Sequence, residues 1–459
     1  MEQSIGVGKT SRRDAAYVSY LVGFLSSLAL LFVALMDVRR GFLSPHYLLK
    51  TAWINYNHYQ ILLLAAGLGG LLIFYRFLKE GELREAVSSE RAKMLGRITA
   101  FGIFAILSVT LVFIYRGIAM FRILEAGKMS IPALGLSPAQ LPGTKELMPL
   151  ATTPYLLKPL AVAVNYMSLV WGATLMGLLL AGLAATVAPL YFGGLFSAKG
   201  AGKLRPLLGG MVYGIPQPFC SCCAAPISAA IYRSSRSVAA AVAFLLTSPT
   251  LNVTALILAA ALLPAPYAML RIVGGAVFVV AVAYLAASLG ERIAGDESRQ
   301  PPGRFLTLVS RIFNPYCNLF HFEPLGESRA TPAGVIASWA HNSWRVAKVA
   351  LPTLFVGAVL AGIVAVFLPT VFTNDFKGVA LASLLGTLFM ISTWTEIPVA
   401  GVLAGQGLSG PAAALLVTLP SVSLPCLLLF GGALRSARIA VVLGAATFVF
   451  GLAAGLFFL

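Results

Sequence analysis

The sequence GIPQPFCSCCAAPIS, residues 214 to 228, breaks an otherwise apolar chain. It holds Cys220, Cys222 and Cys223 among three prolines. Proline removes a backbone hydrogen-bond donor and disrupts a helix. Within a membrane, non-helical backbone is tolerated only where protein shields it or a watery cavity lies beside it. We therefore expect residues 214–226 to form a protein-lined turn and not a lipid-facing helix.

The composition around this motif is that of a membrane protein. Of the 459 residues, 59% are hydrophobic and 11% are charged, whereas a soluble domain is about 25% charged. The net charge of +17 comes from basic residues in short loops, which fits the positive-inside rule and not a nucleic-acid partner. We expect an all-α polytopic membrane protein whose surroundings are the lipid bilayer of the plasma membrane.

Apolar stretches of about 20 residues, the length of a membrane-spanning helix, recur along the chain. They predict about nine full spans and two broken segments that enter the membrane and turn back. The spans are predicted near 16–36, 58–75, 98–121, 159–192, 237–260, 268–290, 347–369, 411–431 and 438–459, and the broken segments near 207–232 and 378–406. We expect a three-span region (1–122), an external loop (123–158), a first repeat (159–290), a cytoplasmic linker (291–345) and a second repeat (346–459).

The two repeats are inferred from matching landmarks. APISAAIYRSSRSVAAAVAFLLTSP (225–249) is similar to IPVAGVLAGQGLSGPAAALLVTLP (397–420), and one deletion aligns them. Pro226 corresponds to Pro398, Ser237 to Ser409 and Pro249 to Pro420, and each half reads span, broken segment, span, span. Internal repeats are common in transporters. Similar composition of two apolar segments is the alternative explanation.

Basic residues also predict an orientation. The loop 76–97 is rich in Lys and Arg, so this loop and the N-terminus are expected to be cytoplasmic. If the broken segments enter and turn back, the first repeat begins outside and the second begins inside. The two repeats are then inverted, and their broken segments meet near the membrane midplane, where such transporters bind substrate.

The position of the cysteines predicts a ligand site. We expect Pro226 in the first turn of a helix that starts near Cys222 to Ala225, because proline is favoured there. The N-terminus of a helix favours a thiolate or an anion. Cys220 and Cys222 are two residues apart, so they face the same way in extended backbone and can chelate a soft metal or metalloid. The alternative, that cysteine is a small buried hydrophobic residue, is preferred for Cys317 and Cys426, which each stand alone.

The matching break in the second repeat is STWTEIPVAG, residues 392 to 401, and it contains Glu396. A charge at the bilayer centre costs about 2.5–3.5 kcal/mol on insertion scales. Glu396 is therefore expected to be a proton or cation site that faces the thiols; the alternative is an ion pair with Arg116 or Arg271. The same cavity is expected to be lined by neighbouring residues that otherwise only join helices: Pro218, Ser221, Thr247, Ser248, Thr250, Asn252, Thr395, Thr418, Ser421 and Ser423.

The motif GIPQPFCSCCAAPIS, followed by AFLLTSPTLN, resembles the predicted-permease family that includes the ArsP organoarsenical efflux permeases. That family shows the pattern G-I-P-x-P-F-C-S-C-x-x-x-P and then F-L-x-x-P. The resemblance is strong over 205–260 and looser over 347–459. It implies a permease and, for some members, export of trivalent organoarsenicals through cysteine coordination. Cys220 and Cys222 match the family pattern, whereas Cys223 stands where the family often has glycine.

Two functions are consistent with these features. The first is a secondary transporter, not an enzyme, that exports a small thiophilic solute such as a trivalent organoarsenical or a soft metal, coupled to protons through Glu396. The second is a membrane protein that handles thiols, disulfides or other sulfur compounds with Cys220, Cys222 and Cys223. No phosphate-binding loop for ATP is recognisable, so gradients or a partner are expected to supply the energy. No cofactor is expected, and no oligomeric state follows from the sequence.

Overall fold

A computed structural model describes residues 2–36, 58–83, 89–111, 147–187, 190–191, 202–217, 219–296, 311, 330–367, 372–389, 396–434 and 436–459. Within these ranges the regular elements are helices and no strand occurs. Eight helical stretches of the described chain are long and apolar enough to cross a membrane, and a ninth is added if the bent helix α5 counts as one span. The predicted fold class, an all-α polytopic membrane protein, is confirmed.

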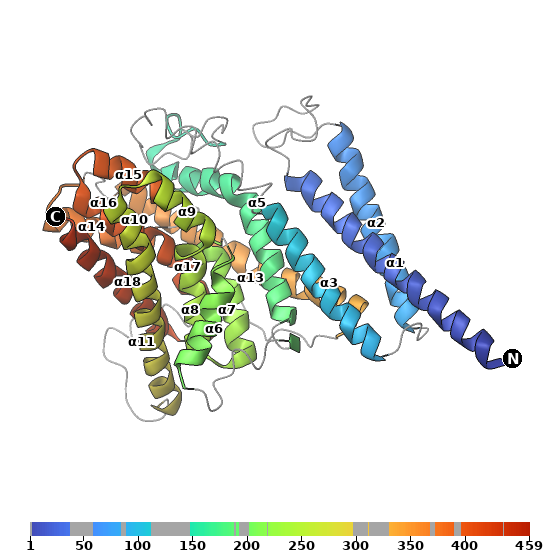
Figure 1. The fold of residues 1–459 in the computed structure, drawn as a ribbon. Coiled ribbons are helices and arrows are strands. Elements are labelled where there is room, and N and C mark those ends of the chain that lie inside the picture. Colours follow the sequence, from blue (N-terminus) through green and yellow to red (C-terminus); the bar gives the residue numbers. More distant parts are fainter. Residues whose placement is uncertain are drawn as a thin grey trace.

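Three helices form the N-terminal region: α1 (Glu2–Met36), α2 (His58–Leu83) and α3 (Ser89–Val109). Helices α1 and α2 lie side by side at one end of the molecule, and α3 lies between them and the remaining helices (Figure 1). Only 11% of the α2 span is buried, and large apolar side chains such as Leu62 and Leu72 are exposed on it. This surface is suited to lipid.

Glu82, near the end of α2, joins the N-terminal region to the rest of the protein. Its carboxylate accepts hydrogen bonds from the Tyr17 hydroxyl of α1 at 2.8 Å, the Thr331 hydroxyl at 2.9 Å and the Ala333 backbone N–H at 2.7 Å. Helix α13 spans Pro332–Phe367, so Glu82 satisfies one of the N–H groups that a helix start leaves without an intrahelical partner.

Helices α5 (Lys158–Val187) and α13 pack along each other. Helix α5 bends by 65° between Ser168 and Trp171. Helix α13 begins at Pro332, within the segment 291–345 that was expected to be a linker. Its polar side chains reach α5, because Trp339 Nε1 donates to the Leu179 carbonyl at 2.8 Å and the Asn342 amide donates to Thr186 Oγ1 at 3.0 Å.

The remaining helices occur in the same order twice. The first set is α6 (Leu204–Gly214), α7 (Ser221–Ser235), α8 (Val238–Thr250), α9 (Val253–Leu262), α10 (Ala265–Met269), a π-helical segment (Leu270–Gly274) and α11 (Gly275–Asp296). The second set is α14 (Phe376–Leu388), α15 (Glu396–Gly405), α16 (Ser409–Ser421), α17 (Leu424–Leu434) and α18 (Ala437–Phe457). Helices α6 and α7 both pack on α8, as α14 and α15 both pack on α16. The duplication and the inversion of one half relative to the other both stay predictions.

The first broken segment consists of two short helices, α6 and α7, joined by a non-helical stretch. In the second, α14 ends at Leu388 and α15 begins at Glu396, and residues 390–395 between them lie outside the described part of the chain. The first break is shorter than expected, because α7 begins at Ser221 with Cys220 as its N-cap residue. The expectation that residues 214–226 form one turn is therefore wrong for the part after Cys220. Pro226 lies in the second turn of α7, not the first, where it leaves the Cys222 carbonyl without its usual helical N–H donor.

Candidate functional site

The turn between α6 and α7 is held by the break between α8 and α9. The Ser248 hydroxyl donates to the Gln217 carbonyl at 2.8 Å, and the Val253 backbone N–H donates to the Ile215 carbonyl at 3.3 Å. Gly214, at the end of α6, faces Thr247 so closely that a Cβ atom would lie 3.0 Å from the Thr247 Cβ. Backbone groups of the turn are thus satisfied by protein, as expected for a break at membrane depth.

Two motif thiols lie in contact at the start of α7. The Sγ atoms of Cys220 and Cys223 are 3.1 Å apart, and Cys223 Sγ also lies 3.8 Å from the Ala173 carbonyl of α5. The expected pairing of Cys220 with Cys222 rested on extended backbone, but the chain is helical from Ser221 onward. Residues three apart on a helix are neighbours, whereas residues one or two apart do not face each other. The described thiol pair is therefore Cys220 with Cys223.

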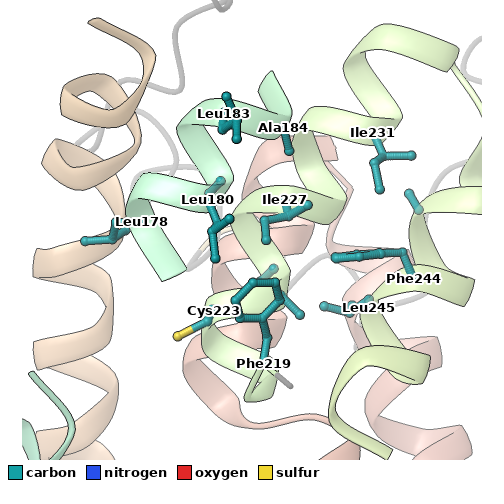
Figure 2. Close-up of a cluster of buried hydrophobic side chains, with 14 of the residues drawn as sticks. Leu178, Leu180, Leu183, Ala184, Phe219, Cys223, Ile227, Ile231, Phe244 and Leu245 are labelled. Atoms are coloured by element: carbon teal, nitrogen blue, oxygen red, sulfur yellow. The ribbon is translucent and has the colours of Figure 1, made fainter. Parts of the chain in front are cut away.

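The thiol pair is buried against apolar side chains. Cys220 is 7% exposed and Cys223 is 4% exposed. Figure 2 shows Cys223 beside Phe219 and Ile227, in a cluster to which α5 contributes Leu180. Gly177 of α5 makes room for the pair, because a Cβ atom there would lie 2.8 Å from Cys223 Sγ.

The second half of the protein contacts the start of α7, where the thiol pair lies. The hydroxyls of Ser221 and Ser423 are 3.2 Å apart, which links the start of α7 to the break between α16 and α17. Cys426 of α17 is fully buried, and α17 packs against α7. From the sequence alone, Cys426 is interpreted as an isolated hydrophobic residue, although it lies only three residues after Ser423. Among the described residues, no three His, Cys, Asp or Glu side chains are placed to hold a metal ion.

Glu396 forms an ion pair with Arg271. Its Oε1 atom lies 2.8 Å from Arg271 Nη2, and the two side chains are 0% and 1% exposed. Of the two interpretations of Glu396, the ion pair with Arg271 is the one with a contact in the structure, and a proton role for Glu396 stays a prediction. The pair joins α15, in the second set of helices, to the π-helical segment of the first set.

Arg271 also binds α8 and α16, each of which contains a proline near its C-terminal end. Its Nη1 atom donates to the Leu416 carbonyl of α16 at 2.8 Å, and Nη2 donates to the Pro249 carbonyl of α8 at 3.0 Å. Leu416 lies four residues before Pro420, which has no N–H, so that carbonyl lacks its helical donor. Pro249 lies in the last turn of α8, where carbonyls also lack helical donors. Short π-helical segments inside α-helices are frequent at functional sites. In this protein the π-helical segment contains Arg271.

The hydroxyl and amide residues near the first break are buried and bonded to backbone. Thr250 donates to the Leu246 carbonyl, and the Asn252 amide donates to the Ser248 carbonyl at 2.9 Å. The Asn252 side-chain oxygen accepts from the Ala255 N–H at 2.8 Å as the N-cap of α9. Thr247 Oγ1 is buried with no hydrogen-bond partner among the described residues. The Thr250 contact lies within α8, and those of Asn252 connect α8 with the start of α9. A substrate role for Thr250 and Asn252 stays a prediction.

Some residues proposed from the sequence lie outside the described part of the chain. They are Pro218, Thr395, Cys317, Arg116 and the side chain of Cys222.

Membrane-crossing helices, two broken segments and a buried charge pair between the two repeats together define a membrane transport protein. The chain belongs to the predicted permease family, which it matches over residues 201–458. It is therefore a membrane permease, a transporter by class. The N-terminal helices α1 to α3 and α5 lie before the matched region.

Two relatives carry names without an assigned activity. The UPF0718 protein YraQ of Escherichia coli (strain K12) is 28% identical over 273 residues, 58% of this chain and 71% of that protein. The UPF0718 protein MJ0584 of Methanocaldococcus jannaschii is 28% identical over 275 residues, 49% of this chain and 74% of that protein. No solved structure matches the chain.

Proposed function

We propose that this permease exports a small thiophilic solute, such as a trivalent organoarsenical or a soft metal ion. The supporting observation is the contact of Cys220 with Cys223 at 3.1 Å, at a helix start and against the second half of the protein. Thiolates are preferred ligands of soft centres, and the helix N-terminus favours their charged form. A trivalent arsenic atom with one organic substituent has two further bonds to make, which suits a pair of thiols. Cys222, which belongs to the same cysteine cluster, is a further proposed substrate-binding residue.

Glu396 is the proposed coupling residue, and Arg271 sets the condition for its protonation. The guanidinium stabilises the carboxylate through their contact at 2.8 Å, so Glu396 takes up a proton when the two side chains separate. Ionised Glu396 holds α15 to the π-helical segment, whereas protonated Glu396 releases it. Transport of the solute and uptake of the proton are in this way linked to one movement between the repeats. Ser221, Thr250, Asn252, Pro218 and Thr395 line the path beside the thiols.

The proposed arrangement in the plasma membrane places the N-terminus in the cytoplasm and inverts the second repeat relative to the first. The loops at 233–236 and 405–409 then lie on opposite sides of the membrane. Single cysteines introduced in each loop of a cysteine-free variant, labelled in intact cells by an impermeant maleimide, test this topology. Equal labelling of both loops from one side contradicts it.

The thiol site is tested by titrating the purified full-length protein with phenylarsine oxide, a trivalent arsenical. Cys220→Ser and Cys223→Ser are expected to abolish binding, and Cys222→Ser is expected to weaken or abolish it. Cys317→Ser, a cysteine outside the motif, is expected to bind like the parent protein. Unchanged affinity in both Cys220→Ser and Cys223→Ser refutes the thiol site, and export assays in vesicles then test whether a bound solute is moved.

A further inference from the structure

The contact between Cys220 and Cys223 also brings the two thiols close to the geometry of a disulfide bond. The two residues form a C-x-x-C pair at positions N-cap and N3 of α7, and the Cys223 N–H donates to the Cys220 carbonyl at 3.0 Å. This hydrogen bond fixes the short loop between them. Their Sγ atoms are 3.1 Å apart, so about 1 Å of approach reaches the length of a disulfide bond. Both are present as thiols in the structure.

The surroundings favour reaction of this pair over other pairings of cysteines. Cys220 lies at the helix N-terminus, where the N–H groups stabilise a thiolate. Cys223 is held on the same side by Gly177, whose lack of a side chain leaves room for its sulfur. Cys222 is adjacent to Cys223, and neighbouring helix positions do not face each other.

We propose that Cys220 and Cys223 are a reversible oxidation site that reacts with small, uncharged disulfides. Exposures of 7% and 4% exclude a bulky protein disulfide as the reactant. This inference goes beyond the proposed export function, because it requires neither transport nor a metalloid.

The reaction is a thiol–disulfide exchange in two steps. The Cys220 thiolate attacks one sulfur of the disulfide R–S–S–R, the S–S bond breaks, and R–S⁻ leaves and takes up a proton. Cys223, after losing its proton, then attacks the Cys220 sulfur of the mixed disulfide and displaces the second R–S⁻, which is also protonated. The two cysteines lose two electrons and two protons, and the disulfide is reduced to two thiols. A dithiol reductant reverses both steps.

The site is tested on the purified full-length protein with 2-hydroxyethyl disulfide as the oxidant. After oxidation, remaining thiols are blocked under denaturing conditions, and mass spectrometry locates the disulfide. We expect a bond between Cys220 and Cys223 in the parent protein and in the Cys222→Ser variant. We expect Cys223→Ser to stop at a mixed disulfide on Cys220. Cys426→Ser controls for the nearby thiol and is expected to oxidise like the parent.

Absence of oxidation in the parent protein, or a bond that requires Cys222 or Cys426, overturns the proposal. Binding of phenylarsine oxide separates this inference from the export function. Oxidised protein is expected to lose that binding, and reduction is expected to restore it. A protein that forms the Cys220–Cys223 bond but never binds phenylarsine oxide refutes the thiol-based export site and leaves the oxidation site established.

Discussion

Replacement of Glu396 by glutamine tests the buried ion pair directly. Glutamine has nearly the same shape, but it leaves the Arg271 guanidinium, which is 1% exposed, without an opposing charge. Removing one partner of a buried pair costs about 3–5 kcal/mol. Two backbone carbonyls still accept from Arg271, and the glutamine oxygen can accept a third hydrogen bond. We therefore expect a loss near the lower end, about 3 kcal/mol in the free energy of unfolding.

The measurement is a double-mutant cycle by chemical unfolding of the detergent-solubilised protein, with Glu396→Gln, Arg271→Met and the double variant. The double variant has no buried charge, so it is expected to lose less stability than the sum of the single losses, by about 0.5–3 kcal/mol. Glu80→Gln is the matched control, because Glu80 pairs with Arg76 at the exposed surface of α2. Such a surface pair contributes about 0–1 kcal/mol.

Two results would refute this reasoning. The first is a Glu396→Gln variant as stable as Glu80→Gln, and the second is strict additivity in the cycle. The same variants test coupling in proteoliposomes, where Glu396→Gln is expected to transport without the pH response of the parent protein. If its transport keeps that response, Glu396 is not the coupling residue, whatever its effect on stability.

Three further substitutions test other contacts. Gly177→Ala is expected to displace Cys223 and slow its oxidation with Cys220, because the new Cβ would lie 2.8 Å from the Cys223 sulfur. The control is Gly405→Ala, whose new Cβ has no atom within 4 Å and should leave the oxidation rate unchanged. Equal oxidation rates in the two variants would contradict this prediction. Glu82→Ala removes the acceptor of three donors and is expected to lower the melting temperature through a loss of about 1–3 kcal/mol; an unchanged melting curve argues against the anchor. Hydrogen bonds from a backbone N–H and a hydroxyl lower the pKa of Asp375, the N-cap of α14. The contribution of Asp375 to stability is therefore complete above about pH 4 and is lost as the pH falls through the folded-state pKa. Asp375→Asn should remove this loss of stability at acid pH, measured by unfolding curves recorded at a series of pH values.

Hydropathy and proline positions predicted most of the helices. Each span predicted from apolar length overlaps a helix in the described residues, because a membrane-crossing helix requires that length. The sequence pattern predicted the wrong start for α7, because Pro226 was expected in the first turn of the helix. The structure has Pro226 in the second turn. Such a proline is tolerated there because surrounding helices bury the segment, and this packing cannot be read from the sequence. Polar residues such as Asn342 made α13 look shorter than it is, because their partners on α5 were not visible in the sequence.

The sequence predicted which residues belong to the candidate site better than it predicted which of them contact one another. The sequence marked both the cysteine cluster and Glu396 as unusual, and the structure places them at the starts of α7 and α15. It did not single out Cys223 as the partner of Cys220, because that depends on which residue caps the helix. Arg271 was one of two candidates for Glu396, and choosing it required the π-helical segment that directs it toward Pro249 and Leu416.

The Arg271–Glu396 pair also bears on biogenesis. The two residues are 125 positions apart in the chain, so during synthesis the arginine reaches the membrane well before its counter-ion exists. Until then, the nascent first half carries an uncompensated cation in a segment destined for burial, at a cost of about 2.5–3.5 kcal/mol on insertion scales. The corresponding position to Glu396 in the first half is Ala224, which is fully buried and offers no substitute charge. The first half therefore lacks its own counter-ion for Arg271, and its final assembly must wait for translation of the second half.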